Sequence, residues 1–323
     1  MKTNLIIGAG QIGSRHLQGL LNLNTPQTIY VLDPSEQSLE IAKKRAEEIP
    51  NKHITQFISD WTSLPIDLDL VIVATGANVR KQVVNILLNG FKVKYVVLEK
   101  ILFQDVQSYK EVAELIRQKD VPVWVNHPRR IFDNYLAIKQ ELPFDEPIKF
   151  HVIGNNWGLG CNGLHFIDLC AFLSGSEVDS INTDWIDDEL LESKRSGYIE
   201  FAGTLKGMMK NGSCFSVSSF KGDLNLLSVS ISTASESWVT MEGAMSITYH
   251  QKTGDGRTDY KRLSATKFQS QLTTVIANDL FLNATCDLPT YEEACLSHVP
   301  FIEVLLKKYN DLTGIENKIC PIT

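Results

Sequence analysis

Two side chains of this sequence combine a residue type and a position suited to proton-transfer chemistry. Lys100 follows the apolar run 95–98 in the order Glu99-Lys100. A partly desolvated ammonium there can stabilise a developing alkoxide and hold the reacting oxygen. His165 follows a glycine-rich segment, and an unperturbed imidazole exchanges protons near neutral pH. Lys100 and His165 are therefore the candidate catalytic pair.

Three polar residues are candidates for supporting roles. Asp168 lies three residues after His165 and shares its helical face, so it either orients the imidazole as a catalytic partner or is a structural carboxylate. Arg130 is a candidate substrate anchor through bidentate hydrogen bonds, with a salt bridge at the domain junction as the alternative. Asn162 is a further candidate substrate contact.

A glycine loop near the N-terminus predicts a phosphate site. The segment 8–13 reads G-x-G-x-x-G between an apolar run and a helical pattern. In such loops the first glycine permits the turn, the second lets a pyrophosphate approach, and the third allows close helix–strand packing. The helix N-terminus adds open N–H groups and partial positive charge. The predicted cofactor-binding residues of this loop are Gly8, Gly10, Gln11, Ile12 and Gly13.

Asp33 supplies the second part of a dinucleotide signature. It ends the second apolar run, about 20 residues after Gly13, where a carboxylate accepts hydrogen bonds from an adenosine ribose. Its charge would repel a 2′-phosphate, and the following Pro34-Ser35-Glu36 contains no arginine. The sequence therefore favours NAD over NADP, with a plain turn or helix cap as the alternative role of Asp33.

The first half of the chain alternates apolar runs with amphipathic helices. Continuous apolar strands separated by helices predict a parallel, doubly wound sheet covered on both faces. The expected strands are 5–7, 29–32, 53–57, 70–74, 95–98 and 121–125, and the expected helices include 36–49, 79–88 and 106–117. We expect an N-terminal Rossmann domain over residues 1–127.

The character of the sequence changes after Pro128. A helix over 131–141, a strand over 148–153 and a helix over 164–173 precede a Ser/Thr-rich region, 178–250, with period-two alternation. That alternation is typical of an antiparallel sheet with one covered face. Helices near 266–282 and 291–309 complete a predicted α+β domain, 128–323, for substrate binding and oligomerisation.

Bulk composition excludes several classes of protein. The net charge of −7 argues against nucleic-acid binding. No apolar stretch reaches the roughly 18 residues of a membrane span, and the N-terminal apolar run is too short for a signal peptide. Six scattered cysteines without a C-x-x-C motif predict no metal site and suit a reducing compartment, so a cytoplasmic location is expected.

Several motifs together resemble the Gfo/Idh/MocA oxidoreductases, whose members include glucose-fructose oxidoreductase and inositol dehydrogenase. The resemblance covers essentially the whole chain. The family's Glu-Lys-Pro stands here as 99–101 and its Thr-Pro-Asn segment as 75–78. Its aromatic-x-x-Arg stands as 127–130, and its Asp-x-Gly-x-His with a following Asp as 161–168. The segment 288–294 is similar to the start of the family's late helix.

The resemblance implies hydride transfer between nicotinamide and a carbinol or carbonyl carbon of a sugar, amino sugar or nucleotide sugar. It implies that Lys100 contacts both cofactor and substrate, and that His165 is the acid/base. It also places Thr75, Asn78 and Glu99 on the cofactor side. Relatives commonly pair through the open C-terminal sheet, so a homodimer or homotetramer is expected.

The sequence departs from the family at four motif positions. Gly76 replaces a proline and Arg80 replaces a histidine at a helix start. Cys161 replaces an aspartate and Ile101 replaces a proline. Inert packing and a reactive thiol are both open for Cys161. Two alternatives to a dehydrogenase follow: an enzyme that recycles its NAD within one turnover, such as a lyase, epimerase or glycosidase, and a non-catalytic dinucleotide-binding regulator.

Overall fold

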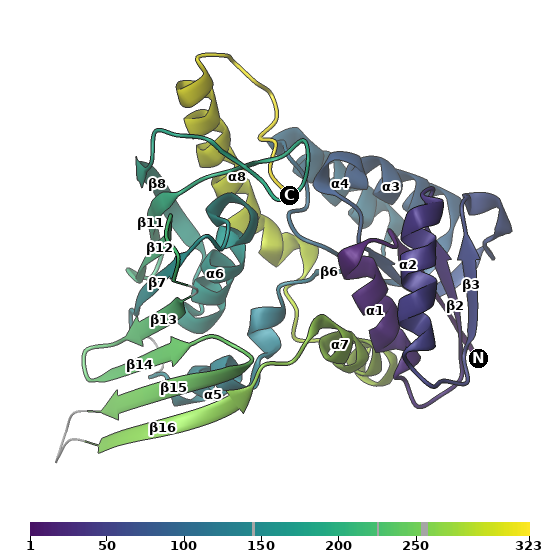
Figure 1. Ribbon diagram of the computed structural model, residues 1–323, viewed down its shortest axis with the longest axis horizontal. Helices are drawn as coiled ribbons and strands as arrows, with labels where there is room; N and C mark the ends of the chain where they lie inside the picture. The colour runs from purple at the N-terminus through teal and green to yellow at the C-terminus, as the bar shows by residue number, and fades with distance from the viewer. Residues whose placement is uncertain (144–145, 225, 253–257) are drawn as a thin grey trace. The chain divides into compact units, whose positions relative to one another are not determined.

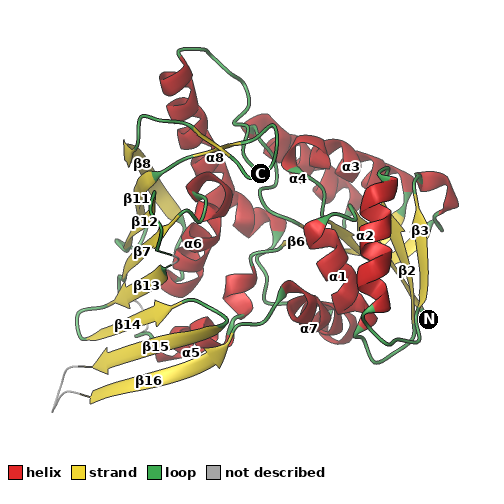
Figure 2. Ribbon diagram, in the orientation of Figure 1, coloured by secondary structure: helices red, strands yellow, loops and turns green. Residues whose placement is uncertain are grey.

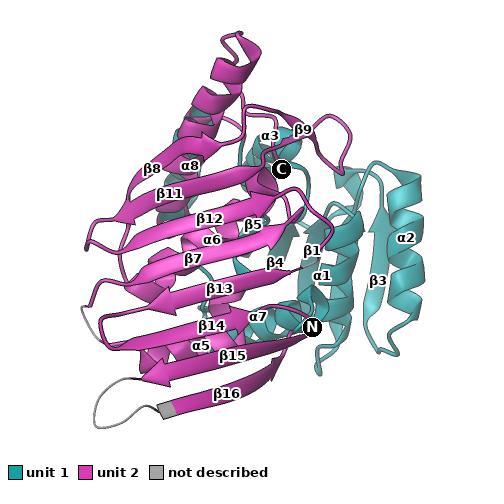
Figure 3. Cartoon of the chain, turned by 60° about the vertical axis from the view of Figure 1, so that its left-hand side comes forward, with its two compact units in different colours: residues 1–103, 107–128, 267–292 teal, residues 104–106, 129–266, 293–323 magenta. Residues whose placement is uncertain are grey.

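The computed structural model describes residues 1–143, 146–224, 226–252 and 258–323. These residues form two compact units, coloured separately in Figure 3. Unit 1 comprises residues 1–103, 107–128 and 267–292. Unit 2 comprises residues 104–106, 129–266 and 293–323.

Unit 1 is built on a six-stranded parallel sheet with strand order β3-β2-β1-β4-β5-β6. The carboxyl-terminal halves of its central strands β1 and β4 are buried because they are continuous apolar runs. This is the predicted doubly wound order, and it reverses between β1 and β4. The strands are β1 (Lys2–Ile7), β2 (Gln27–Leu32), β3 (Ile54–Ile58), β4 (Asp67–Val73), β5 (Lys92–Leu98) and β6 (Val123–Val125).

Helices connect the successive strands of unit 1. Figures 1 and 2 show the long helices α1 and α2 packed side by side. The Ser35 side chain accepts a hydrogen bond from the N–H of Ser38 and so starts α2. The helices are α1 (Gln11–Leu21), α2 (Glu36–Glu47), α3 (Ala77–Gly90) and α4 (Val106–Lys119), with a 3₁₀ turn η1 (Trp61–Ser63) before β4.

Helix α7 (Gln269–Asn283) also belongs to unit 1, whereas the sequence boundary at 127/128 assigned it to the second domain. It packs on α1 at Gly19. A Cβ at Gly19 would lie 2.5 Å from the carbonyl oxygen of Ser270 and 2.5 Å from the Cβ of Thr273. Glycine therefore permits this close helix approach, and Thr274 adds a 2.7 Å hydrogen bond to the Gly19 carbonyl.

Unit 2 is built on an eight-stranded mixed sheet with order β16-β15-β14-β13-β7-β12-β11-β8. Among the strand pairs of this sheet that the structure describes, β7–β12 alone is parallel, so the sheet is largely antiparallel, as predicted. The strands are β7 (Lys149–Asn155), β8 (Val178–Ile186), β11 (Gly203–Met209), β12 (Cys214–Phe220), β13 (Leu227–Ser232), β14 (Glu236–Met241), β15 (Met245–Lys252) and β16 (Thr258–Ala265). A short ribbon pairs β9 (Leu191–Glu192) with β10 (Ile199–Glu200).

One face of the unit 2 sheet is covered and the other is open (Figure 3). The burial of β7 alternates residue by residue, which is the pattern of a strand with one covered face. The covering helices are α5 (Asp133–Glu141), after the 3₁₀ turn η2 (Pro128–Ile131), and α6 (Leu159–Ser174). Helix α8 (Tyr291–Thr313) reaches α6, where Phe301 lies against Gly163.

Helix α6 begins at Leu159, five residues earlier than the sequence predicted. The segment interpreted as a glycine-rich loop is the first turn of the helix. Gly158 has φ +80°, and the Glu200 carboxylate accepts hydrogen bonds from the N–H groups of Gly160 (2.8 Å) and Cys161 (3.1 Å). The carboxylate of Glu200 on β10 thus stabilises the first turn of α6, whose position the local sequence does not predict. Within the described ranges, no helix is both long and apolar enough to cross a membrane.

Candidate functional site

The carboxyl edge of the parallel sheet gathers the cofactor residues predicted in unit 1. The N–H of Ala74 donates to the carbonyl of Ile7 at 2.7 Å. The N–H of Glu99 donates to the carbonyl of Val73 at 3.0 Å. The glycine loop after β1, Thr75 after β4 and Glu99-Lys100 after β5 are therefore neighbours at the point where the strand order reverses, the usual ligand position of such sheets.

The glycines of the loop meet their expected steric roles. Gly8 has φ +98°, and a Cβ there would lie 2.9 Å from the backbone of Ala74. A Cβ on Gly13 would lie 1.7 Å from the Gly8 carbonyl oxygen. Gly10 faces open space and precedes α1, whose N-terminus no described side chain caps. Gln11 and Ile12 form the first turn, so backbone N–H groups point toward an approaching anion.

Asp33 lies half-buried at the end of β2 and is held on both carboxylate oxygens. Oδ2 accepts a hydrogen bond from the N–H of Ala9 at 2.7 Å, and Oδ1 accepts one from the N–H of Ser35 at 2.8 Å. Each oxygen keeps a second lone pair for a ligand hydroxyl. The carboxylate is thus fixed beside the glycine loop.

Thr75 follows β4, and its hydroxyl is buried with no hydrogen-bond partner among the described residues. An unpaired buried hydroxyl at a ligand-binding edge indicates a missing partner. Asn78 is exposed in the first turn of α3. The open helix N-terminus, the three glycines, the fixed Asp33 carboxylate and this hydroxyl together fit a dinucleotide.

Arg80 has a role that the sequence did not reveal. Its side chain is 1% exposed and donates hydrogen bonds to the carbonyls of Thr75, Ile101 and Leu102. The guanidinium therefore joins the segment after β4 to the segment after β5, where the Lys100–Ile101 peptide bond is cis. A buried arginine in the second turn of a helix is not predicted by any local pattern.

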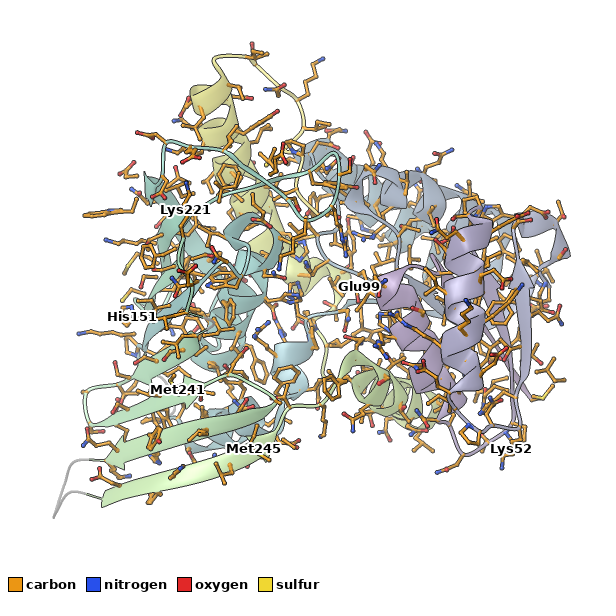
Figure 4. The ribbon with its side chains drawn as sticks, viewed as in Figure 1. Lys52, Glu99, His151, Lys221, Met241 and Met245 are labelled. Carbon is orange, nitrogen blue, oxygen red and sulfur yellow. The ribbon has the colours of Figure 1, made fainter. Side chains whose placement is uncertain are left out.

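Glu99 is the centre of a buried polar network, and Lys100 next to it is half-buried. The Glu99 Oε1 accepts hydrogen bonds from His16 Nε2 (2.9 Å) and Asn126 Nδ2 (2.5 Å). Burial alone would raise the pKa of this carboxyl, but His16, Asn126 and the charge of Lys100 outweigh it and hold the pKa below its usual range. Glu99, labelled in Figure 4, is accordingly ionised beside Lys100.

In unit 2, Arg130 and Asp168 form a buried ion pair. Nε and Nη2 of Arg130 donate to the two carboxylate oxygens at 2.9 and 2.8 Å. The side chains are 11% and 1% exposed. Burial raises the pKa of Asp168, and Arg130 opposes that rise only in part. The structure thus shows a salt bridge for Arg130, but within unit 2 and not at a domain junction as the alternative had it. His165 lies in the second turn of α6 and is 9% exposed.

A cavity of about 340 Å³ in unit 2 adjoins the start of α6. Its volume lies in the range of ligand pockets. Cys161 and Asn162 line it, and each is also tied locally: the Cys161 thiol donates to the Thr323 carbonyl at 2.7 Å, and Asn162 Nδ2 donates to the Trp157 carbonyl at 2.6 Å. Further lining residues are Trp157, Glu200, Phe201, Phe220 and Lys221.

A second charged cluster of unit 2 forms around Arg129 and Glu242. Arg129, which precedes Arg130, donates to both carboxylate oxygens of Glu242 at 2.9 and 2.7 Å. The Tyr135 hydroxyl donates to the same carboxylate at 2.6 Å. The two adjacent arginines therefore hold different carboxylates. Over the described ranges, no group of three or more His, Cys, Asp or Glu residues could hold a metal ion, and all six cysteines are free thiols.

Comparisons with known proteins agree with this geometry. Residues 2–127 match the model of the GFO_IDH_MocA family, described as an oxidoreductase family with an NAD-binding Rossmann fold. In sequence, no curated protein matches the chain. An oxidoreductase from Agrobacterium radiobacter, in complex with NAD+, L-tartaric acid and magnesium, has a TM-score of 0.73 at 14% identity, covering 93% of this chain and 94% of that chain.

Two further solved structures share the fold. UDP-N-acetylglucosamine 3-dehydrogenase GnnA from Acidithiobacillus ferrooxidans has a TM-score of 0.68 at 12% identity over 97% of both chains. The transcriptional regulator Gal80p from Kluyveromyces lactis has a TM-score of 0.72 at 15% identity, covering 96% of this chain and 92% of that chain. At these identities the likeness shows the fold, which supports more than one function.

Proposed function

We propose, from the match of residues 2–127 to the GFO_IDH_MocA model of NAD-binding oxidoreductases, that the protein is an NAD-dependent sugar dehydrogenase or reductase. Its substrate class is a sugar, amino sugar or nucleotide sugar. The observation that carries the proposal is the carboxyl edge of unit 1, where the glycine loop, Thr75 and Glu99-Lys100 are neighbours.

In this proposal, different residues of that edge bind different parts of the cofactor. Gly8, Gly10 and Gly13, with the first turn of α1 at Gln11 and Ile12, hold the pyrophosphate by backbone N–H groups. Asp33 accepts hydrogen bonds from the ribose hydroxyls. Bound NAD supplies the two-electron chemistry. On the nicotinamide side, the available contacts are those of Thr75, Asn78, Glu99 and Lys100.

The proposed chemistry needs a group that holds the reacting oxygen and a group that moves its proton. Lys100 Nζ donates a hydrogen bond to the substrate oxygen and stabilises negative charge as it develops there. His165 accepts the hydroxyl proton during oxidation and returns it during reduction. Asp168 supports His165 on the same helix while it is held by Arg130. Asn162 and Arg130 are the proposed substrate contacts.

Replacement of Lys100 tests the proposal. With Lys100→Ala, NADH binding should change little, because Asp33 and the glycine loop are untouched. Turnover on a panel of sugars and nucleotide sugars should fall by at least about 10²-fold, the effect of one strong catalytic group. Lys110→Ala, an exposed lysine on α4, is the matched control. If Lys100→Ala turned over substrate as fast as the wild type, Lys100 would not be the catalytic residue and the proposal would be wrong.

A non-catalytic nucleotide-binding regulator is the second candidate. Two observations favour it: Cys161, at the position of the family's aspartate, donates its thiol hydrogen to a backbone carbonyl, and the fold is shared with a transcriptional regulator. Tight NADH binding without turnover on the whole panel, together with a normal cellular phenotype for Lys100→Ala, would favour the regulator over the enzyme.

The open face of the unit 2 sheet supports a homo-oligomer. Cross-strand pairs align a mostly apolar row across this face, and pairing through such a row buries it against an identical copy. The row contains Leu263, Ile247, Met241, Ile153 and Trp185, with Ser228, Ser218 and Thr204 between them. Six free thiols fit a reducing compartment, so we include a cytoplasmic location in the proposal.

A further inference from the structure

The cavity of about 340 Å³ in unit 2 lies beside the helix that carries His165, the proposed acid/base residue. Cys161 and Asn162, in the first turn of α6, line this cavity. Residues three and four apart share one face of a helix, so His165 lies on the same side of α6 as these two residues. A substrate that reacts at His165 can therefore extend along α6 into the cavity.

Aromatic side chains form part of the cavity lining, and one of them is held in place. Trp157 Nε1 donates to the Ser218 carbonyl at 2.9 Å, and the Trp157 ring meets that of Phe166 nearly edge-on, with centroids 5.3 Å apart. Phe201 and Phe220 also line the cavity. Rings that are fixed before binding offer a planar ligand a stacking surface at little cost in conformational entropy.

Cationic side chains line the same cavity from the turn of the β9–β10 ribbon. Lys194 and Arg195 are exposed there, and neither has an ion-pair partner among the described residues. Lys221, labelled in Figure 4, lines the cavity from the end of β12 but pairs with Glu189 at 2.5 Å. The charges of Lys194 and Arg195 are therefore available to an anionic ligand.

The carboxylates of the lining do not cancel this positive charge. Glu200 accepts hydrogen bonds from the backbone N–H groups of Gly160 at 2.8 Å and Cys161 at 3.1 Å, so its charge is used at the start of α6. Glu192, exposed on β9, is the remaining carboxylate among the described lining residues. Two uncompensated cations thus face one uncompensated carboxylate, and the cavity favours an anion.

We infer that this cavity binds a nucleoside diphosphate group, with the base on the aromatic lining and the diphosphate at Lys194 and Arg195. A ligand that carries both a planar ring and negative charge uses both parts of the lining, whereas a neutral monosaccharide has no charge to offer the two cations. The substrate class then narrows to nucleotide sugars. That last step rests on the proposed function, whereas the binding of a nucleoside diphosphate does not.

Isothermal titration calorimetry of the full chain with UDP, CDP and GDP tests the site without turnover. ADP is left out, because the glycine loop and Asp33 are the proposed site for the ADP half of NAD. At least one of the three should bind, at one per chain, and saturating NADH should not displace it. Binding of none of them, or displacement by NADH, would overturn the inference.

The parts of the best-bound nucleotide test the two halves of the lining separately. The matching nucleoside and inorganic pyrophosphate should each bind at least about tenfold more weakly than the nucleoside diphosphate, because each meets only one half of the lining. Pyrophosphate that binds as tightly as the nucleotide would contradict a base site. A nucleoside that binds as tightly would contradict a diphosphate site.

Replacement of the two cations locates the bound nucleotide. The double variant Lys194→Ala/Arg195→Ala should weaken its binding at least about tenfold, through the loss of charge-assisted hydrogen bonds. Lys149→Ala, at an exposed lysine at the other end of β7, should leave the affinity unchanged, and so should Asp33→Asn. Thermal unfolding confirms that each variant is folded. Affinity lost in Asp33→Asn but kept in the double variant would place the nucleotide at the glycine loop and overturn the inference.

Turnover separates the substrate assignment from the binding site. On the proposed function, nucleotide sugars should be turned over, and the double variant should raise their KM with little change in kcat, because binding common to the ground and transition states is lost. Turnover of free sugars alone would overturn the assignment of this group to the substrate. Normal turnover by Lys100→Ala would instead overturn the proposed function and leave the measured nucleotide binding intact.

Discussion

The backbone N–H of Ala9, within the glycine loop, donates a 2.7 Å hydrogen bond to Oδ2 of Asp33 at the end of β2. One carboxylate thereby stabilises the loop and sets the charge that a bound ribose would meet. The two tasks depend on different properties of the side chain, since the loop needs an acceptor and cofactor selection needs a negative charge.

Asp33→Asn should separate these tasks. The amide oxygen still accepts from Ala9, but the charge that repels a 2′-phosphate is gone. We expect the ratio of the NADPH to the NADH dissociation constant to fall about tenfold or more, measured by fluorescence titration. Asp69→Asn is the matched control, because Asp69 accepts a 2.8 Å hydrogen bond from the Thr3 N–H at the start of β1. Equal ratios for Asp33→Asn and the wild type would show that Asp33 is not the selector.

Asp168→Asn should destabilise the protein strongly. The change leaves the Arg130 guanidinium, 11% exposed, without its bidentate carboxylate. Breaking one side of a buried ion pair costs about 3–5 kcal/mol of unfolding free energy. Denaturant unfolding measures the loss, with Asp311→Asn as a control at the exposed pair with Lys307, where little change is expected. A loss no larger than that control would argue that the pair is not a structural anchor.

The Glu242 cluster should make stability fall in acid. Burial alone would raise the pKa of Glu242, but Arg129 and the Tyr135 hydroxyl outweigh it and lower the pKa. The unfolded carboxyl, with a pKa of about 4.3, then binds protons at a pH where the folded one does not. Stability from this group is therefore present above that pH and is lost as the pH falls further. Unfolding free energy measured from pH 6 down to about pH 3 should decline less steeply for Glu242→Gln. The same slope for variant and wild type would contradict this.

A charge on the open sheet face should dissociate the proposed oligomer. Ile153 is 52% exposed on β7 and lies in the mostly apolar row across the sheet, between Ser228 and Ser218. Ile153→Lys places an ammonium opposite its own copy or against apolar side chains. Light scattering after size exclusion should then give a smaller species than the wild type, while Val79→Lys, at an exposed apolar residue of α3, should not. A wild-type protein that is already monomeric would contradict the proposed face.

The parts of the site that follow from strand order were predictable from sequence. Carboxyl ends of parallel strands share one edge, so apolar runs ending at Gly8, Asp33, Thr75 and Glu99 were sufficient to bring those residues together. The two sheets were predicted on the same basis, from continuous apolar runs in one half of the chain and alternation in the other.

The side chains that hold the site were not predictable, because their partners are distant in sequence. His16 is three residues past Gly13, but its partner Thr273 lies on a helix that was assigned to the wrong side of the domain boundary. Glu200 stabilises the start of α6 from a two-residue strand. Such pairings depend on how elements pack, and hydrophobic periodicity carries no information about them.

The central claim is that the carboxyl edge of unit 1 binds NAD for a reaction at Lys100, and cofactor binding tests its first step most directly. Protein freed of bound nucleotide should be titrated with NADH and with NADPH, and any nucleotide released on denaturation should be identified by mass spectrometry. The account predicts saturable binding of NADH, tighter than that of NADPH, with stoichiometry of one per chain. Failure of both nucleotides to bind would contradict it, and the glycine loop would then be only a turn.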